Sequence, residues 1–320
     1  MNINFIVQRG RLEREAAILA TSLVTVGKVA PANIRAFFPV QTDKWPGEVT
    51  PTRKCREFLE GLGVTLVPFD NKAYGGAYPH ANRIYAMAAL GGDDLMMDTD
   101  MVALGPVRLP DATLALGKPM RRPRVGPGSG PDAQWDIAYA ACDLGDAVNQ
   151  VAEIGEDAEP VKRPYYNAGM IYAQDAASFG ALWLDCLARV YTVRDQLGGL
   201  LKQKKWSLDQ ISLPIAIQRS GTPVTALPMK IYNNVDNAQD TLLWHYHFVY
   251  ALFSPWTDEI EPRLGPVLNN EDLLDHLKED EIFQFWRSPE GRIAYRDAVG
   301  REPATGKSRR VLRQKGYKFR

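Results

Sequence analysis

The chain has 320 residues, 45% of them hydrophobic and 24% charged, a composition that argues against global disorder. Lysine and arginine together number 38, and so do aspartate and glutamate, so the net charge gives no indication of a nucleic-acid partner. The cysteines, Cys55, Cys142 and Cys186, form no C-x-x-C pair, which argues against a disulfide framework and against a cysteine zinc site.

The sequence predicts a soluble, cytoplasmic protein. The N-terminal apolar stretch "INFIV" (3–7) is too short for a signal peptide, and no apolar run is long enough to cross a bilayer. The last stretch, "GKSRRVLRQKGYKFR" (306–320), carries seven basic residues and no acidic one. Such a tail could make peripheral contact with a membrane or bind an anionic partner, and a solvated terminus is the simpler expectation.

The first hundred residues alternate between β-rich apolar runs and helical patterns. The predicted strands are 3–7, 33–40 and 64–69, and the predicted helices are 11–26, 50–63 and 78–90. In the second helix, Thr50 is the expected N-cap, Pro51 follows it, and Gly61 or Gly63 ends the helix. Alternation of this kind predicts an α/β fold with a mainly parallel sheet flanked by helices.

The fourth predicted strand, "DLMMDTD" (94–100), ends on two carboxylates, Asp98 and Asp100. Residues i and i+2 of a strand point to the same face, and two like charges side by side repel unless a cation or protons offset them. Ligands of parallel α/β sheets bind beyond the carboxyl ends of the strands. The pair is therefore a metal site, a nucleophile with its acid/base partner, or a solvated strand end.

Beyond residue 104 the pattern is less regular. We predict a loop over 117–135, strands over 165–173 and 241–253, and helices from Asp175 and over 206–217. The basic residues of the loop make it a candidate lid over a ligand. We expect a main domain over 1–257 and a helical appendage with the basic tail over 258–320.

One interpretation of "LMMDTDMV" is a phosphatase of the haloacid-dehalogenase type, which the stretch resembles. Asp98 would then be the nucleophile and Asp100 the acid/base. That motif normally lies on the first strand of its domain, whereas three strand–helix units precede it here.

The longer stretch "HANRIYAMAALGGDDLMMDTDMVAL" resembles the segment that leads into the D-x-D motif of glycosyltransferases with the GT-A fold, and loosely those of family 8. Arg83 matches an arginine that contacts the sugar nucleotide in that family. The resemblance implies a mixed, mainly parallel GT-A sheet and a nucleotide-diphosphate sugar as donor. It also implies Mn²⁺, or Mg²⁺, as the cofactor.

Two downstream segments extend the resemblance. "YYNAGMIYA" (165–173) matches a family strand at Asn167, Ala168 and Gly169, and "SLDQISLP" (207–214) matches a helix start at Asp209 and Gln210. The resemblance implies that Asn167, Asp209 and Gln210 act on the donor sugar. A glycine such as Gly169 also permits a close approach of backbone.

"LLWHYHFVYALFSPW" (242–256) resembles the family's C-terminal metal-binding segment. The resemblance makes His245 the third metal ligand beside Asp98 and Asp100, with His247 a competing ligand or a donor contact. Two positions depart from the family: Phe248 replaces a glycine, and Ser254 stands where a lysine normally precedes Pro255–Trp256. That lysine steadies the departing diphosphate, and the candidate replacements are His247, Lys230, Arg121, Arg122 and Arg124.

The resemblance implies a metal-dependent transfer of a sugar, from a UDP-sugar in the first instance, to a glycan, lipid or small-molecule acceptor, with retention of configuration. The remaining donor-binding candidates are Val7, Gln8 and Arg9 after the first strand, and Thr99 between the two aspartates. A non-catalytic sugar-nucleotide-binding module is the other alternative, and the missing lysine favours it.

Overall fold

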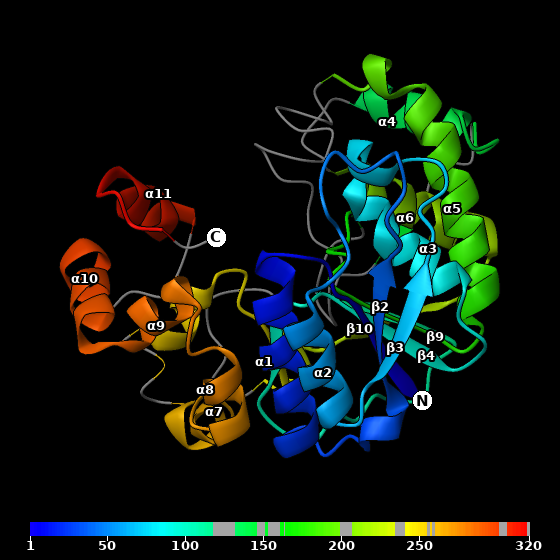
Figure 1. Ribbon diagram of the computed structural model, residues 1–320. Helices are drawn as coiled ribbons and strands as arrows, with labels where there is room; N and C mark the ends of the chain where they lie inside the picture. Colours follow the sequence, from blue (N-terminus) through cyan, green and yellow to red (C-terminus); the bar gives the residue numbers. More distant parts are fainter. Residues whose placement is uncertain are drawn as a thin grey trace.

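A seven-stranded sheet forms the centre of the structure, a computed structural model (Figure 1). The structure describes residues 1–117, 132–145, 151–152, 161–162, 164–198, 207–233, 241–254, 257, 260–300 and 306–318. The sheet order is β10-β6-β9-β4-β1-β2-β3. Its strands are β1 (Asn2–Ile6), β2 (Ile34–Pro39), β3 (Thr65–Phe69), β4 (Asp94–Met97), β6 (Leu114–Gly117), β9 (Met170–Ala173) and β10 (Val224–Leu227).

Most neighbours in this sheet are parallel. β4, β1, β2 and β3 run the same way, and β10 is parallel to β6. β9 lies antiparallel between β4 and β6. The predicted fold class, a mixed and mainly parallel sheet flanked by helices, is therefore confirmed.

Helices cover both faces of the sheet (Figure 1). α1 (Arg11–Thr25) and α2 (Arg53–Gly61) pack on one face with Leu95 and Met97 of β4. Met96 points the other way, as strand alternation requires, into a core shared with the helices of the opposite face. Those helices are α3 (Asn82–Ala88), α4 (Asp132–Ala140), α5 (Ala176–Thr192) and α6 (Leu208–Ser220).

The chain leaves the main sheet directly after β4. β5 (Met101–Ala103) belongs to a small sheet in which it pairs antiparallel with β12 (Leu243–His245), and β12 pairs parallel with β11 (Tyr232–Asn233). A third sheet is the pair β7 (Val151–Ala152) and β8 (Val161–Lys162). The prediction of one strand over 94–100 is wrong, because residues 98–100 form the link between two sheets.

Two other predicted boundaries are wrong. The N-cap of α2 is Thr52 and not Thr50, because the Thr52 hydroxyl accepts from the Cys55 N–H at 3.2 Å. The predicted strand over 241–253 ends at His245, because His247 adopts a left-handed φ of 58° and a 3-10 helix follows over Val249–Phe253. The predicted N-cap Asp175 of α5 is confirmed, since it accepts from the Ser178 N–H at 3.0 Å.

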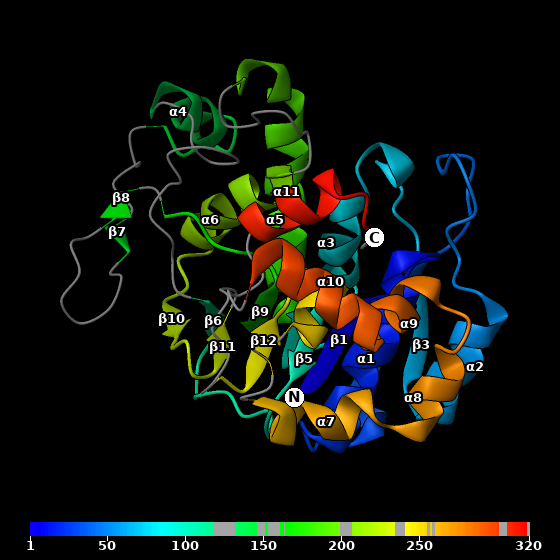
Figure 2. The same ribbon diagram turned by 90° about the vertical axis from the view of Figure 1, so that its left-hand side faces the viewer.

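The C-terminal part is helical and packs on α1 and α2. Its helices are α7 (Glu261–Leu268), α8 (Glu271–His276), α9 (Glu281–Arg287), α10 (Pro289–Val299) and α11 (Gly306–Gln314). Ala17 and Ile18 of α1 belong to the same buried cluster as Phe283, Trp286 and Leu312 of these helices. Figure 2 shows α7 to α11 together on one side of the molecule. The division at residue 257 stays a prediction. No helix in the described ranges has the length and apolar character of a membrane span.

Candidate active site

Asp98 and Asp100 lie in the link between β4 and β5, at the carboxyl end of a central strand. The Asp98 N–H donates to the Gly169 carbonyl at 2.8 Å, and the Asp100 carbonyl accepts from the Tyr246 N–H at 3.0 Å. The first bond ties the link to β9, and the second ties it to the end of β12. Segments far apart in the sequence thus meet at the two carboxylates.

His245 reaches the carboxylates because β12 pairs with β5. In that register His245 lies opposite Met101, next to Asp100. Its Nε2 is 2.9 Å from Asp100 Oδ1 and 3.9 Å from Asp98 Oδ2. The three residues predicted as metal ligands are therefore neighbours in the structure.

His247 joins the same group through a turn and not through strand alternation. Its left-handed φ of 58° brings its ring against that of His245, with ring centroids 3.9 Å apart. Ligand atoms of Asp100, His245 and His247 all lie within 4.8 Å of one another. Strained backbone at a non-glycine residue often marks a functional position.

Gly169 allows His245 to lie close to β9. A Cβ at Gly169 would be 2.7 Å from Cε1 and Nδ1 of His245 and from Oδ1 of Asn167. Asn167 Oδ1 accepts from the Gly169 N–H at 2.8 Å and from the Tyr232 hydroxyl at 2.7 Å. The Asn167 side chain is therefore fixed, with its amide NH₂ group as the remaining donor.

Arg83 lies between Asp98 and Asp209. Its guanidinium is 2.7 Å from Asp98 Oδ1 and 3.9 Å from Asp209 Oδ2, and it donates to the Ala168 carbonyl at 2.7 Å. Asp209 is only 1% exposed and accepts from the Tyr78 hydroxyl at 2.8 Å. Asp209 thus lies behind Arg83, whereas Gln210 faces outward and accepts from the Tyr165 hydroxyl.

The pKa values of the two aspartates are shifted in opposite directions. Burial raises the pKa of Asp98 and outweighs the opposite effect of Arg83. Burial alone would also raise the pKa of Asp100, but the charge and the hydrogen bond of His245 hold it well below its usual value. Burial would lower the pKa of His245, and Asp100 raises it instead. Asp100 and His245 therefore stabilise each other's charged forms.

A cavity of about 670 Å³ opens over these residues. Among the predicted site residues, Gln8, Arg83, Thr99, Asn167, Gln210 and His247 line it together with the metal-ligand candidates Asp98, Asp100 and His245. Val7 is fully buried, and Arg9 pairs with Glu48 at 2.7 Å, so neither of these two lines the cavity. Arg121, Arg122, Arg124 and the Pro255–Trp256 step lie outside the described residues.

Sequence reasoning missed several lining residues. Arg11 begins α1, two residues after the predicted exit loop, and its Nη1 is 4.0 Å from Asp100 Oδ2. Asn82 immediately precedes Arg83 and donates to Gln8 at 3.1 Å. Phe248 and Arg309 also line the cavity. Position next to a recognised motif could have indicated Arg11 and Asn82, whereas nothing local indicates Arg309.

The donor set fits a divalent cation. Carboxylate oxygens and imidazole nitrogens suit Mn²⁺, and here they converge on one cavity wall. Arg83 offsets the charge of Asp98, and a bound cation would offset the charge of Asp100, as the repulsion between paired carboxylates requires. The metal would lie beside Asp100, where both histidines present ring nitrogens.

Comparison with known proteins identifies the family. Residues 3–221 match the family model of the Rhodobacterales glycosyltransferase domain. The chain belongs to this family. The predicted glycosyltransferase activity is therefore confirmed at the level of the enzyme class, and the phosphatase interpretation is set aside. The match includes Asp98, Asp100, Asn167 and Asp209, whereas His245 lies beyond its end.

Solved structures similar to this glycosyltransferase have low sequence identity to it. Mouse xyloside xylosyltransferase 1, in its apo form, is 12% identical with a TM-score of 0.43, covering 76% of this chain and 96% of that one. The WbbM bifunctional glycosyltransferase in its apo structure is 14% identical with a TM-score of 0.46, covering 87% and 51%. The glycosyltransferase GlyE of Streptococcus pneumoniae TIGR4 is 11% identical with a TM-score of 0.40, covering 77% and 54%. This glycosyltransferase thus spans about half the length of the last two. No curated protein matches the chain.

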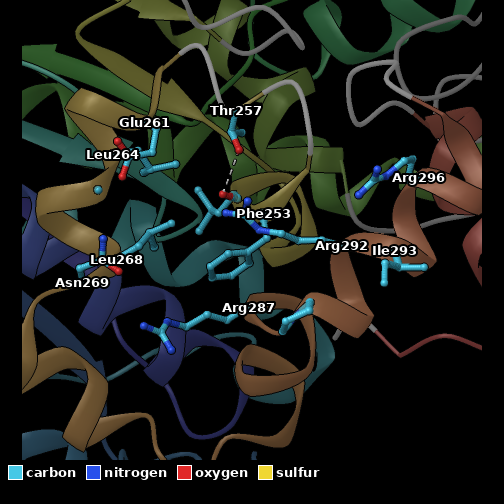
Figure 3. A pocket seen from close by; sticks show the side chains of 13 residues that line it. Phe253, Thr257, Glu261, Leu264, Leu268, Asn269, Arg287, Arg292, Ile293 and Arg296 are labelled. Atoms are coloured by element: carbon cyan, nitrogen blue, oxygen red, sulfur yellow. Dashed lines mark hydrogen bonds between the residues drawn. The ribbon is translucent and has the colours of Figure 1, made fainter.

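A second cavity, of about 530 Å³, lies among the C-terminal helices of the glycosyltransferase (Figure 3). Its charged lining consists of Arg287, Arg292 and Arg296 with the single carboxylate Glu261. It shares no lining residue with the cavity over Asp98 and Asp100. Because its lining holds neither paired carboxylates nor a histidine, it does not compete as the metal-binding site.

Proposed function

We propose that this glycosyltransferase transfers a sugar from a nucleotide-diphosphate sugar, bound with Mn²⁺ or Mg²⁺ in the cavity over Asp98 and Asp100. The observation that carries the proposal is the convergence of Asp98, Asp100, His245 and His247 at the carboxyl end of β4. Seven separate segments of the chain line this cavity, and ligands of such sheets bind at this end. A UDP-sugar is the first donor to test.

When bound, the divalent cation supplies positive charge to the donor diphosphate. The side chains of this protein then hold and orient the donor. The contacts with Asp98 and Ala168 fix the position of Arg83 before a ligand binds. Preorganisation of this kind lowers the entropy cost of binding and favours tight binding. Asn167 and Gln210 face the cavity with amide donors for sugar hydroxyls.

We assign Asp209 a positioning role. Its carboxylate is buried against Tyr78 and lies 3.9 Å from Arg83 Nε. Asp209 therefore acts on the donor through Arg83. Gln8, held by Asn82, is the candidate contact for the nucleotide. The acceptor would be a glycan, a lipid or a small molecule, and retention of configuration is the outcome that the family 8 resemblance implies.

The test is a thermal-shift screen of UDP-, dTDP-, GDP- and ADP-sugars, each with and without Mn²⁺. We expect one nucleotide to raise the melting temperature only in the presence of the metal, because a ligand that binds the folded state stabilises it by mass action. A protein that no combination stabilises would contradict the proposal. Transfer of the sugar, measured with the identified donor, separates an enzyme from a non-catalytic binding module.

The Asp100→Asn variant tests the metal site itself. The amide keeps the shape but removes the negative charge beside His245, so we expect the metal-dependent part of the stabilisation to disappear. Asp93→Asn is the matched control, since Asp93 lies in the same motif but is 53% exposed. Equal loss in both variants, or loss in neither, would count against a metal at Asp100.

A further inference from the structure

The basic C-terminal tail reaches the candidate active site. Arg309 of α11 lines the same cavity as Asp98, Asp100 and His245. Its guanidinium carbon is 5.1 Å from the centroid of the Phe248 ring, a cation–π distance. Phe248 is the residue that replaces the glycine of the family motif, so one of the two departures from the family pattern forms the contact with Arg309.

Packing fixes α11 in this position. Ser308 and Leu312, four residues apart and therefore on one helix face, are 2% and 0% exposed. After the helix, the Lys318 carbonyl accepts from Trp286 Nε1 at 2.8 Å, and Tyr317 stacks on Phe285. Arg310, Arg313, Lys315 and Lys318 are exposed. Among the basic tail residues whose side chains are described, Arg309 alone lines this cavity.

Arg309 is also the cation of this cavity that is least committed to a carboxylate. Arg83 lies 2.7 Å from Asp98 Oδ1, and Arg11 Nη1 lies 3.1 Å from Glu15 Oε1 and 4.0 Å from Asp100 Oδ2. Among the described residues, no carboxylate lies within 4.0 Å of the Arg309 guanidinium. A guanidinium stacked on a ring keeps its N–H donors in its own plane, where they can bind phosphate oxygens in a fork.

The position of the missing lysine cannot supply this charge. Ser254 is 1% exposed, and its hydroxyl donates to the Ala251 carbonyl at 2.9 Å. Lys230 is exposed and lies outside the cavity lining. His247 lines the cavity, but its ring packs against His245.

We propose that Arg309 binds the diphosphate of the donor and stabilises the negative charge of the departing nucleoside diphosphate. The inference rests on the proposed function. In the transfer, the bond between the anomeric carbon and the β-phosphate oxygen breaks, and its electron pair leaves with the nucleoside diphosphate. The acceptor oxygen forms the new glycosidic bond, and its proton is released to solvent. Arg309, positioned by Phe248 and α11, thus supplies the positive charge that the lysine supplies in the family.

The experiment compares Arg309→Ala, Arg309→Lys and Arg310→Ala in the full chain. Arg310 is the matched control, because it is the next residue of the same helix and is exposed. Calorimetry with UDP and with UMP, each with Mn²⁺, measures the contribution of the β-phosphate. If the screen identifies another base, the corresponding pair of nucleotides replaces UDP and UMP.

We expect Arg309→Ala to weaken binding of the diphosphate by about tenfold or more, since a hydrogen bond to a charged group is worth about 1.5–3 kcal/mol. The monophosphate should lose much less, Arg309→Lys should recover part of the affinity, and Arg310→Ala should match wild type. Unchanged melting temperatures without ligand establish that the variants fold.

Two failures are distinguishable. If wild-type protein binds no nucleoside diphosphate with Mn²⁺, the proposed function fails. If wild type binds one and Arg309→Ala binds it as well as Arg310→Ala does, the donor site stands and the role of Arg309 is overturned. Equal losses for the diphosphate and the monophosphate would also overturn a contact to the β-phosphate.

Discussion

Gly169 decides how closely the metal-ligand candidates approach each other. A methyl group at this position would meet His245 and Asn167 at 2.7 Å, well inside van der Waals contact. His245 cannot move away freely, because Asp100 holds its Nε2 and β5 holds its backbone. Adding one methyl group here therefore perturbs the site directly.

We expect Gly169→Ala to weaken Mn²⁺-dependent nucleotide binding by at least tenfold and to destabilise the fold by about 1–3 kcal/mol, the typical cost of overpacking. Calorimetry and chemical denaturation measure the two effects. Gly61→Ala is the control, because nothing lies within 4 Å of a Cβ there. Metal-dependent binding that survives in Gly169→Ala would show that His245 is not required at its observed position.

Glu15 is a buried carboxylic acid of α1 whose pKa depends on the charged residues of the site. It is 1% exposed, pairs with Arg11 at 3.1 Å, and lies on the helix that begins at the cavity. Burial, reinforced by the nearby Asp100, raises the pKa of Glu15 to about 8. The unfolded chain titrates this group near 4.3, so between these pH values the folded protein holds a proton that the unfolded chain has lost.

The contribution of Glu15 to stability is therefore fully present below about pH 4 and is lost as the pH rises through about 8. Glu15→Gln keeps the shape and removes the titration. We expect its melting temperature, relative to wild type, to increase from pH 5 to about pH 8 and to level off above that pH. Parallel curves for the two proteins would show that Glu15 titrates normally in the folded state.

Among the described side chains of helix α11, Ser308 and Leu312 are buried, and Leu312 is the apolar one. Leu312 is fully buried in the cluster of the C-terminal helices, and it does not line the cavity. If α11 positions Arg309, a smaller side chain at position 312 should weaken donor binding indirectly.

We expect Leu312→Ala to weaken nucleoside diphosphate binding nearly as much as Arg309→Ala, because a large-to-small change in a packed core typically costs about 2–5 kcal/mol. Gln314→Ala, an exposed change on the same helix, is the control. Calorimetry on folded protein provides the measurement. If Leu312→Ala binds the nucleoside diphosphate with wild-type affinity, the packing of α11 does not affect donor binding.

The segments of secondary structure differ in how far the sequence predicts them. α1 and α2 repeat apolar residues at helical spacing, and β1 to β3 are rich in aromatic and β-branched or other apolar residues, so local pattern suffices for them. β6 and β10 are four residues each, β6 ends on a glycine and β10 lies between two prolines, and they escaped prediction. The left-handed turn at His247 breaks a run that otherwise reads as a strand.

The candidate site, too, is predicted from the sequence only where local motifs indicate its residues. Asp98, Asp100, Asn167 and His245 were predicted because each lies in a motif with a recognisable local sequence. Arg309 could not be predicted, because its place in the cavity depends on how the C-terminal helices pack against α1 and the 3-10 helix over Val249–Phe253. Tertiary packing of this kind leaves no pattern in the local sequence.

The protein as a whole builds its site from the first and the last helices of the chain. Arg11 of α1 and Arg309 of α11 line one cavity, and the buried cluster that joins α1 to the C-terminal helices is continuous with the cavity wall at Phe248. The family match ends at residue 221. The part beyond it supplies His245, His247 and Phe248, so the candidate site extends past the matched segment.

The most direct test of the central claim is the release of nucleoside diphosphate from the donor found in the screen. Wild-type protein with Mn²⁺ should release it, and an excess of EDTA should stop the release. Asp100→Asn should release none above background, whereas Asp93→Asn should match wild type. Release that continues at the wild-type rate in Asp100→Asn, or that EDTA leaves unchanged, would contradict a metal-dependent glycosyltransferase centred on Asp98 and Asp100.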